Sequence, residues 1–318
     1  MRAATEAGMP DARIDPADPF AGARAALAAR IANRRAAAGE RLTIDEMVAG
    51  VAELRPLPAV AFRVLELSDD AKFSAHELAS LIASDQALTS KILRLANSPF
   101  YGFARRITTV RDAVVLLGFR TVRQSTLAAC VVGDVRRSTS LDYDAFWQFC
   151  VATGMLSEVL ARTEGRYQDQ AFTAGVLHQV GVLALDQFRS DLLRAVIERS
   201  ASGVSRQTAE RDVLGFTTAE LGGALAEHWG FPGDLVAAIG GQTRPLDDLA
   251  AEGGLAATIA RARLYARAYG MSDGVTATSE APPPEEWTHG PLAASLRQAG
   301  GMETILERVD AFMAASAA

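Results

Sequence analysis

The chain has 318 residues, 49% of them hydrophobic and 22% charged, with a formal net charge of −6 at pH 7. This composition predicts a globular protein with one large core or two smaller cores, and its negative charge argues against a general affinity for nucleic acid or anionic membranes. The two cysteines are not at CxxC spacing, no apolar run is long enough to span a membrane, and the first residues lack a signal-peptide core, so we expect a soluble cytoplasmic protein without disulfides.

Helical periodicity dominates the chain, and strand patterns are scarce. Residues 1–20 contain three prolines and predict a mobile leader, while the Arg- and Ala-rich residues 22–38 predict a surface helix or a docking arm. Thr43 and Glu46 have capping-box spacing at the start of the next helix. Further short helices are expected up to Pro56, from Pro58 to Asp69, from a second capping box at Ser74, and from Asp85 to Asn97. These lengths predict a compact bundle.

The segment Leu93–Gly102 reads Leu-Arg-Leu-Ala-Asn-Ser-Pro-Phe-Tyr-Gly, a string too unusual to follow from helical periodicity alone. With Leu54–Pro58, Ile82–Leu88 and Ile107–Gly118 in the same order and spacing, it resembles the HDOD family, catalytically degenerate relatives of the HD phosphohydrolases. The resemblance extends from about residue 50 to about residue 245. The residues of the family signature, whose role is expected to be mainly architectural, are Asn97, Ser98, Phe100, Tyr101 and Gly102.

This resemblance implies an all-α fold, in which an HD-like helical bundle carries an N-terminal helical lobe and a C-terminal helical appendage. The expected segments are a leader with one helix at 1–42, the N-terminal lobe at 43–135, the HD-like lobe at 136–245, and C-terminal helices at 246–318 with an exposed Pro-rich linker at 271–291. The last helix has an apolar stripe that packs either back on the domain or on a second subunit. Packing on the domain is the favoured interpretation.

Residues 175–181 look like the central motif of a metal hydrolase with its chemistry removed. Active relatives carry His-Asp, then a short apolar-Gly-Lys stretch, whereas this chain has His178 followed by Gln179, and Val182 at the lysine position. Phe149, Thr218 and Gln242 occupy other positions where the resemblance leads us to expect histidine. A single imidazole cannot hold a cation that polarises phosphate and acidifies water. We therefore expect no catalytic residue, no metal and no cofactor.

His178 itself has two interpretations. It is flanked by apolar residues, a setting that favours a buried, hydrogen-bonded imidazole. Alternatively, it belongs to a pocket that binds a nucleotide or another anion without turnover, helped by the neutral side chains of Gln179, Thr218, Gln242 and Thr243. The carboxylates of Glu158 and Glu220 lie in amphipathic patterns, where solvated or helix-pairing roles are commoner than metal binding.

Seven arginines and only two aspartates lie between residues 105 and 137, which makes this segment basic in an acidic chain. The candidate contact face consists of Arg105, Arg106, Arg111, Arg120 and Arg123. Scattered solvated arginines are the simplest interpretation. Guanidinium groups also suit an acidic protein or a cyclic dinucleotide. Nucleic acid is disfavoured, because few aromatic residues accompany the arginines.

The resemblance implies a bacterial signalling or regulatory scaffold that acts without catalysis by binding an unidentified signalling protein. We expect no membrane partner, and the sequence leaves open whether the chain forms a homodimer. The alternatives are a residual metal-dependent phosphohydrolase or phosphodiesterase and a nucleic-acid-binding regulator that uses the basic segment.

Overall fold

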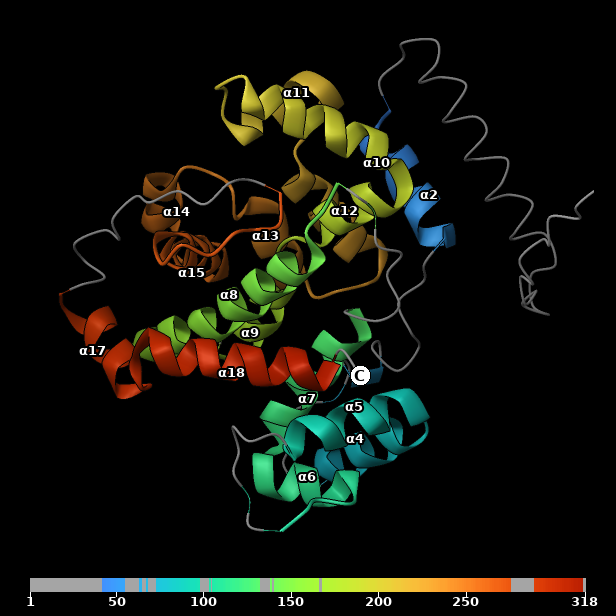
Figure 1. Ribbon diagram of the computed structural model, residues 1–318, viewed down its shortest axis with the longest axis vertical. Coiled ribbons are helices and arrows are strands. Elements are labelled where there is room, and N and C mark those ends of the chain that lie inside the picture. Colours follow the sequence, from blue (N-terminus) through green and yellow to red (C-terminus); the bar gives the residue numbers. More distant parts are fainter. Residues whose placement is uncertain are drawn as a thin grey trace, which may run out of the picture.

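The structure, a computed structural model, describes residues 42–54, 63–64, 67, 73–97, 103, 105–131, 138, 140–165, 168–275 and 289–316. All regular secondary structure in these ranges is helical, which confirms the predicted fold class (Figure 1). None of the helices in these ranges is both long and apolar enough to cross a membrane. The expected leader, the helix at 22–38 and the signature residues Ser98, Phe100, Tyr101 and Gly102 lie outside the described residues.

Four short helices form the N-terminal lobe around a core that includes Leu78, Ile82 and Ile92. Asp85 accepts a hydrogen bond from the Leu88 amide at 3.0 Å, which confirms its expected capping role. The second expected capping box begins at Ser74, but the helix already includes the preceding residue, Phe73. The helices are α4 (Phe73–Ala83), α5 (Gln86–Ala96), α6 (Val110–Leu117) and α7 (Phe119–Val131).

Asn97 fastens the end of α5 to the segment that precedes α6. Its side-chain amide donates to the Leu93 carbonyl at 2.7 Å and to the Ile107 carbonyl at 2.8 Å. Its side-chain oxygen accepts from the Ile107 amide at 2.7 Å. These three bonds close the chain between residues 97 and 107, as expected for an architectural residue.

Helix α2 (Ile44–Leu54) begins with the expected capping box, in which the Glu46 amide donates to Thr43 Oγ1 at 3.2 Å and the Thr43 amide donates to Glu46 Oε2 at 2.9 Å. The helix packs on α10 and α12 of the HD-like lobe, where Met47 is fully buried (Figure 1). The sequence analysis grouped this helix with the N-terminal lobe, whereas its main contacts are with the HD-like lobe. The apolar stripe of α2 packs on the HD-like lobe. Helical periodicity shows that α2 has an apolar face but does not specify which helices cover it.

The HD-like lobe is built around α8, whose residues are almost all buried between Tyr143 and Ala161. Helices α8 and α9 meet at two glycines, because a Cβ added at Gly175 would lie 2.6 Å from the Gly154 Cα. The helices of this lobe are α8 (Tyr143–Glu164), α9 (Gln168–Leu177), α10 (Val180–Ala201), α11 (Arg206–Leu214), α12 (Thr218–His228) and α13 (Gly233–Gly241).

Four further helices form the C-terminal appendage: α14 (Leu246–Glu252), α15 (Leu255–Ala268), α17 (Pro291–Gln298) and α18 (Gly301–Ser316). Helix α18 lies along α8 and reaches α5, so it contacts both lobes (Figure 1). Its residues Ile305, Val309 and Phe312 are buried in a core shared with α8 and α15. The expectation that this stripe packs back on the domain is confirmed.

The first five residues of the expected exposed linker at 271–291 are half-buried or buried. Residues 271–275 pack on the HD-like lobe, where the Gly274 carbonyl accepts from the Asp142 amide at 3.0 Å and Asp273 is buried. Ion pairs to Asp273 hold this segment in place, although its Ser, Asp and Gly residues are typical of an exposed loop. Residues 276–288 lie outside the described residues.

Replacing single side chains of α18 by alanine tests how this helix packs. We expect Phe312→Ala to lower the free energy of unfolding by about 3 kcal/mol, because this ring is 3% exposed and its loss leaves a cavity. Leu306→Ala on the same helix is the control, since Leu306 is 37% exposed, and should cost less than about 1 kcal/mol. Chemical denaturation checks both values, and equal effects would contradict the packing described.

Candidate functional site

His178 lies in the turn between α9 and α10 and is 1% exposed. Its Nδ1 lies 2.6 Å from the Gly175 carbonyl, and because a carbonyl only accepts, Nδ1 carries the proton. Nε2 is then the acceptor nitrogen, and it is buried without a hydrogen-bond partner. Burial, followed by the positive charge of Arg263, lowers the pKa of His178 to about 3. The imidazole is therefore neutral. Its burial and its hydrogen bond to the Gly175 carbonyl confirm the first interpretation, a buried, hydrogen-bonded histidine.

The structure brings three predicted residues around His178. The Phe149 ring is fully buried, with its centroid 5.6 Å from that of the imidazole. Gln242 Nε2 donates to the His178 backbone carbonyl at 3.2 Å. Gln179 is buried beside it in the sequence, and the side-chain oxygens of both glutamines have no hydrogen-bond partner.

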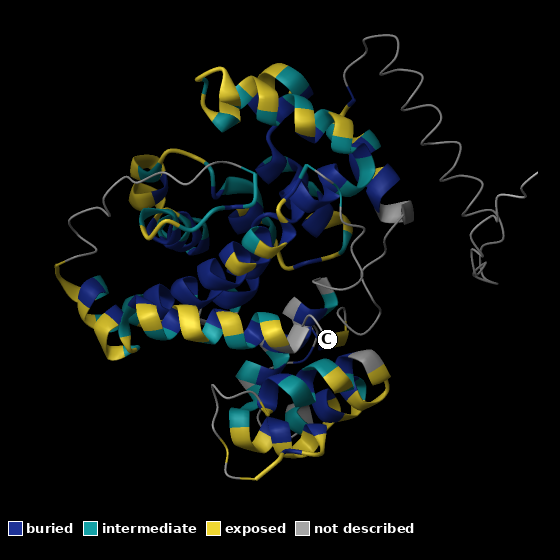
Figure 2. Ribbon diagram, viewed as in Figure 1, coloured by how far each residue is buried: buried dark blue, intermediate teal, exposed yellow. Residues whose placement is uncertain are grey.

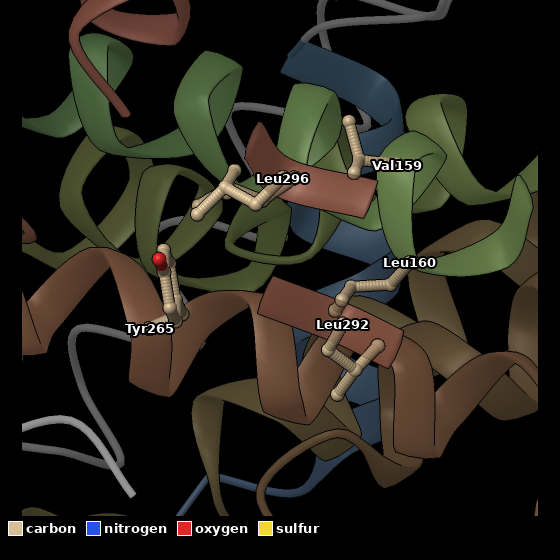
Figure 3. A pocket seen from close by; sticks show the side chains of 6 residues that line it. Val159, Leu160, Tyr265, Leu292 and Leu296 are labelled. Carbon is tan, nitrogen blue, oxygen red and sulfur yellow. The ribbon is translucent and has the colours of Figure 1, made fainter. Parts of the chain in front are cut away.

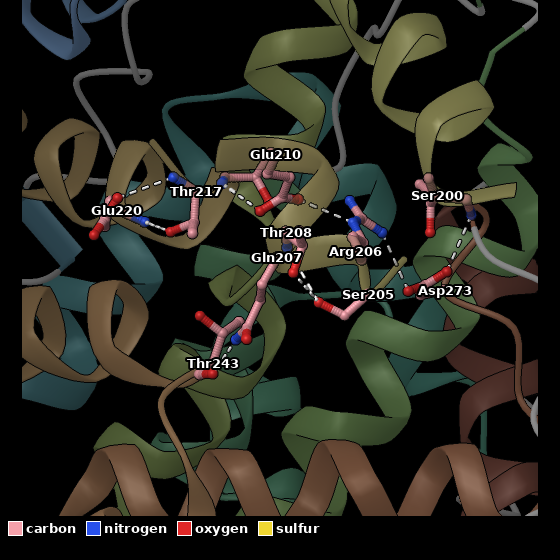
Figure 4. Close-up of polar contacts among 12 residues, drawn as sticks. Ser200, Ser205, Arg206, Gln207, Thr208, Glu210, Thr217, Glu220, Thr243 and Asp273 are labelled. Atoms are coloured by element: carbon pink, nitrogen blue, oxygen red, sulfur yellow. Dashed lines mark hydrogen bonds and ion pairs between the residues drawn. The ribbon is translucent and has the colours of Figure 1, made fainter. Parts of the chain in front are cut away.

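Thr218 is held elsewhere, by a carboxylate that the sequence analysis missed. Its hydroxyl donates to Glu210 Oε1 at 2.7 Å, and its amide donates to Glu210 Oε2 at 3.0 Å. Thr243 contributes its backbone carbonyl to Gln207 (Figure 4). In the described structure, neither residue is bonded to the imidazole.

The buried Glu210 belongs to an ionic cluster on one side of His178. Arg206 Nε donates to Glu210 Oε1 at 2.9 Å, and Arg206 Nη1 lies 3.3 Å from Asp273 Oδ2 (Figure 4). Arg267 pairs with the same Asp273 oxygen at 3.1 Å. We call Arg206, Glu210, Arg263, Arg267 and Asp273 the arginine cluster.

Arg263, the third arginine of this cluster, differs from Arg206 and Arg267 in its electrostatic surroundings. Burial, followed by the positive charge of Arg206, lowers its pKa to about 10. Its Nε is buried without a hydrogen-bond partner. Among the described residues, no carboxylate lies within ion-pair distance of Arg263. The (i, i+4) spacing of Arg206 and Glu210 is readable in the sequence, but nothing there connects them to Arg263 or Asp273.

The two other candidate carboxylates serve helix structure, as expected. Glu158 pairs with Arg162 at 3.1 Å. Glu220 accepts from the Thr217 amide at 2.9 Å, pairs with Arg211 at 2.5 Å, and has a lowered pKa.

The residues around His178 do not fit a divalent metal. Such a cation needs several imidazole or carboxylate donors, and here one imidazole nitrogen stands among neutral amides, an aromatic ring and a positively charged Arg263. Within the described ranges, no three His, Cys, Asp or Glu side chains are placed to hold a metal together.

The residues of the predicted basic face differ in exposure. Arg105, Arg106 and Arg111 are exposed, and Arg111 donates to His76 Nδ1 at 2.8 Å. Arg123 is half-buried, and its Nε donates to the Val64 carbonyl at 3.1 Å. The helix around it packs into the core through Val122. The side chain of Arg120 lies outside the described residues.

Two apolar side chains on α6 extend this face, and the sequence analysis missed them. Val115 is 75% exposed and Leu116 is 50% exposed. Helix α6, which carries them, lies at the edge of the N-terminal lobe (Figure 1) and has exposed stretches (Figure 2). Arg111 lies one turn before Val115, so the two share one side of the helix. We call Arg105, Arg106, Arg111, Val115 and Leu116 the α6 surface.

A separate apolar pocket lies where α8, α15 and α17 meet (Figure 3). Its only polar side-chain group is the Tyr265 hydroxyl, which donates to the Tyr269 hydroxyl at 3.3 Å. The pocket therefore offers no converging polar groups for a substrate. It is lined by Leu156, Val159, Leu160, Tyr265, Leu292 and Leu296.

Comparison with known proteins gives one family and several similar structures. The model of the HDOD domain matches residues 54–245. An uncharacterized protein of Treponema pallidum (strain Nichols) is 26% identical over 190 residues, which are 58% of this chain and 36% of that protein. The chain therefore spans little more than a third of that relative.

Solved structures agree with this match. A "putative phosphohydrolase" from Shewanella amazonensis SB2B is 27% identical, with a TM-score of 0.63 over 85% of this chain and 96% of that chain. A "putative signal transduction protein" from Marinobacter aquaeolei VT8 is 25% identical, with a TM-score of 0.59 over 86% of this chain and 60% of that chain. An HDOD domain protein of unknown function from Geobacter sulfurreducens, 22% identical, has a TM-score of 0.64 over 86% of this chain and 95% of that chain, and shows the fold.

Proposed function

Because the chain belongs to the HDOD domain family, we propose that it is a non-catalytic cytoplasmic signalling protein that acts by binding another protein. One observation carries this proposal. The positions where hydrolase ligands would stand hold a fully buried Phe149, the neutral Gln179, and a Thr218 whose hydroxyl is bonded to Glu210. These groups cannot activate water, so the output of the protein must come from contact.

The alternative function, a residual phosphohydrolase, is suggested by the names of two Shewanella amazonensis structures, a "putative phosphohydrolase" and a "putative metal-dependent phosphohydrolase". We expect the purified chain, supplied with Mn²⁺ or Fe²⁺, to show no turnover of phosphomonoester or phosphodiester substrates. Turnover that is abolished by His178→Gln would contradict the proposal, because it would assign chemistry to the one remaining imidazole.

The α6 surface is the proposed docking site. Its two apolar side chains are unpartnered, and its exposed arginines have no carboxylate partner among the described residues. An isolated basic and apolar patch on a chain of net charge −6 complements an acidic segment with apolar residues on one side. We therefore assign this surface to an acidic amphipathic helix of a partner protein.

A photo-crosslinking amino acid placed at position 115 in the native cell tests this assignment. We expect a discrete adduct whose cross-linked peptide carries net negative charge, and we expect Arg105→Glu combined with Arg106→Glu to remove it. The same probe at position 306, which is also exposed and apolar, is the matched control and should give no such adduct.

Two results would overturn this assignment. One is the absence of an adduct at position 115, and the other is an adduct that forms equally well in the charge-reversed variant. An adduct with a second copy of the chain would replace the acidic partner by a homodimer.

A further inference from the structure

We propose that the arginine cluster is a binding site for a phosphate group, with Arg263 as the residue that the phosphate neutralises. The inference goes beyond docking at α6, because it concerns a different site on the HD-like lobe. It gives the protein a ligand that it holds without turnover.

The first argument is the missing counterion. Arg206 and Arg267 are paired with carboxylates, whereas Arg263 makes no ion pair among the described residues. The two carboxylates whose charges act on it, Glu210 and Asp273, are already bound by those other arginines. A partly buried cation without a partner is costly, and a bound anion would remove that cost.

The second argument is a set of buried polar atoms without partners. Arg263 Nε on α15 and Arg206 Nη2 on α11 are both N–H donors with no acceptor. His178 Nε2 is an acceptor with no donor, in a side chain that is more than nine-tenths buried. The charges of Arg263 and Arg206 both act on this imidazole, so the three groups lie in one region. Unsatisfied buried groups of this kind commonly mark an unplaced water or ion.

The chemistry of these atoms distinguishes between anions. Phosphate oxygens accept from guanidinium N–H groups. A monohydrogen phosphate also keeps one O–H, which can donate to His178 Nε2. Sulfate, acetate and phosphodiesters have no such proton at neutral pH. The site therefore favours inorganic phosphate over those anions, and it favours a phosphomonoester only in the form that keeps its second proton, whose pKa is about 6.

The cluster is accessible from the surface. The side chains of Arg206 and Arg267 are 19% and 21% exposed, so the cluster extends to the surface at these two residues. The unpaired N–H groups of Arg206 and Arg263 are buried beneath it, so an anion reaches them when these side chains shift. Glu210 is buried behind Arg206 and holds the start of α12 through Thr218. An anion that draws Arg206 toward Arg263 would thus be coupled to the position of α12.

Titration of the purified full-length chain with inorganic phosphate tests the proposal. By calorimetry and thermal unfolding we expect saturable binding and a concentration-dependent rise in Tm, and at least tenfold weaker binding of sulfate and acetate. Adenosine monophosphate in a parallel titration distinguishes the two sources, because tighter binding than phosphate indicates a nucleotide ligand and equal or weaker binding indicates free phosphate.

Arg263→Gln is the critical variant. It should lose at least tenfold in phosphate affinity, yet without phosphate it should be at least as stable as the parent, because it removes an uncompensated cation. Arg261→Gln, on the same helix and paired with Glu164, is the matched control and should keep its phosphate affinity.

Three results would overturn the proposal. They are no saturable phosphate binding, unchanged phosphate affinity in Arg263→Gln, and a large loss of stability in that variant without phosphate, which would make Arg263 a structural residue. None of them affects the adduct expected at position 115, so the two proposals fail independently.

Discussion

Gly181→Ala is expected to destabilise the native protein by about 3 kcal/mol or more, the largest effect of any single methyl group in this site. A Cβ at position 181 would lie 1.9 Å from the Thr218 carbonyl oxygen and 2.7 Å from the Gly222 amide nitrogen. Both are backbone atoms of α12, so no side-chain rotation can relieve the overlap. Helices α10 and α12 would have to separate, and the loop that carries His178 would move with them.

Gly233→Ala is the control for this experiment. No atom lies within 4 Å of a Cβ placed there, and the residue is the first of α13, so alanine should be neutral or slightly stabilising. Urea unfolding followed by circular dichroism measures both variants. A Gly181→Ala protein within 0.5 kcal/mol of the parent, roughly the scale of a neutral surface change, would show that the two helices are not in this contact.

The features that the sequence predicted correctly are local ones. The capping box at Thr43 and the cap at Asp85 depend on residues three positions apart, so their spacing is visible in the chain itself. The stripe of α18 follows helical periodicity, and its three inward residues are buried as expected. The apolar neighbours of His178 likewise predicted a buried imidazole.

The features that could not be predicted depend on which elements meet. Nothing within α2 indicates that it packs on α10 and α12. In the sequence, Asp273 has the neighbours of a loop residue. Only the fold brings it to Arg206 of α11 and Arg267 of α15, which both pair with it. Arg111 and Arg123 each follow a Thr-Val pair in the sequence and lie on a helix, but Arg111 is exposed whereas Arg123 is half-buried and its Nε donates to the Val64 carbonyl. Helical periodicity identifies which face of a helix is apolar, but it does not identify the element that packs on that face.

Acidification is expected to weaken the fold specifically through His178. Its native pKa of about 3 lies below the ordinary value of 6.5. Between these two pH values the imidazole is therefore protonated in the unfolded chain and neutral in the native protein. The stabilising contribution of the neutral imidazole is complete above pH 6.5 and is lost as the pH falls toward 3. Within this window the free energy of unfolding should fall by about 1.4 kcal/mol per pH unit from this group alone.

His178→Gln isolates this contribution, because glutamine does not titrate and can still donate to the Gly175 carbonyl. Carboxylates titrate in both proteins, so their effect cancels in the difference between the two unfolding free energies. We expect the advantage of the parent over the variant to be constant above pH 7 and to shrink steadily between pH 6 and pH 4. A difference independent of pH would mean that the imidazole is protonated in the native state or lies open to water. A buried, neutral Nε2 acceptor would then be absent, and the preference of the arginine cluster for a protonated phosphate would lose its physical basis.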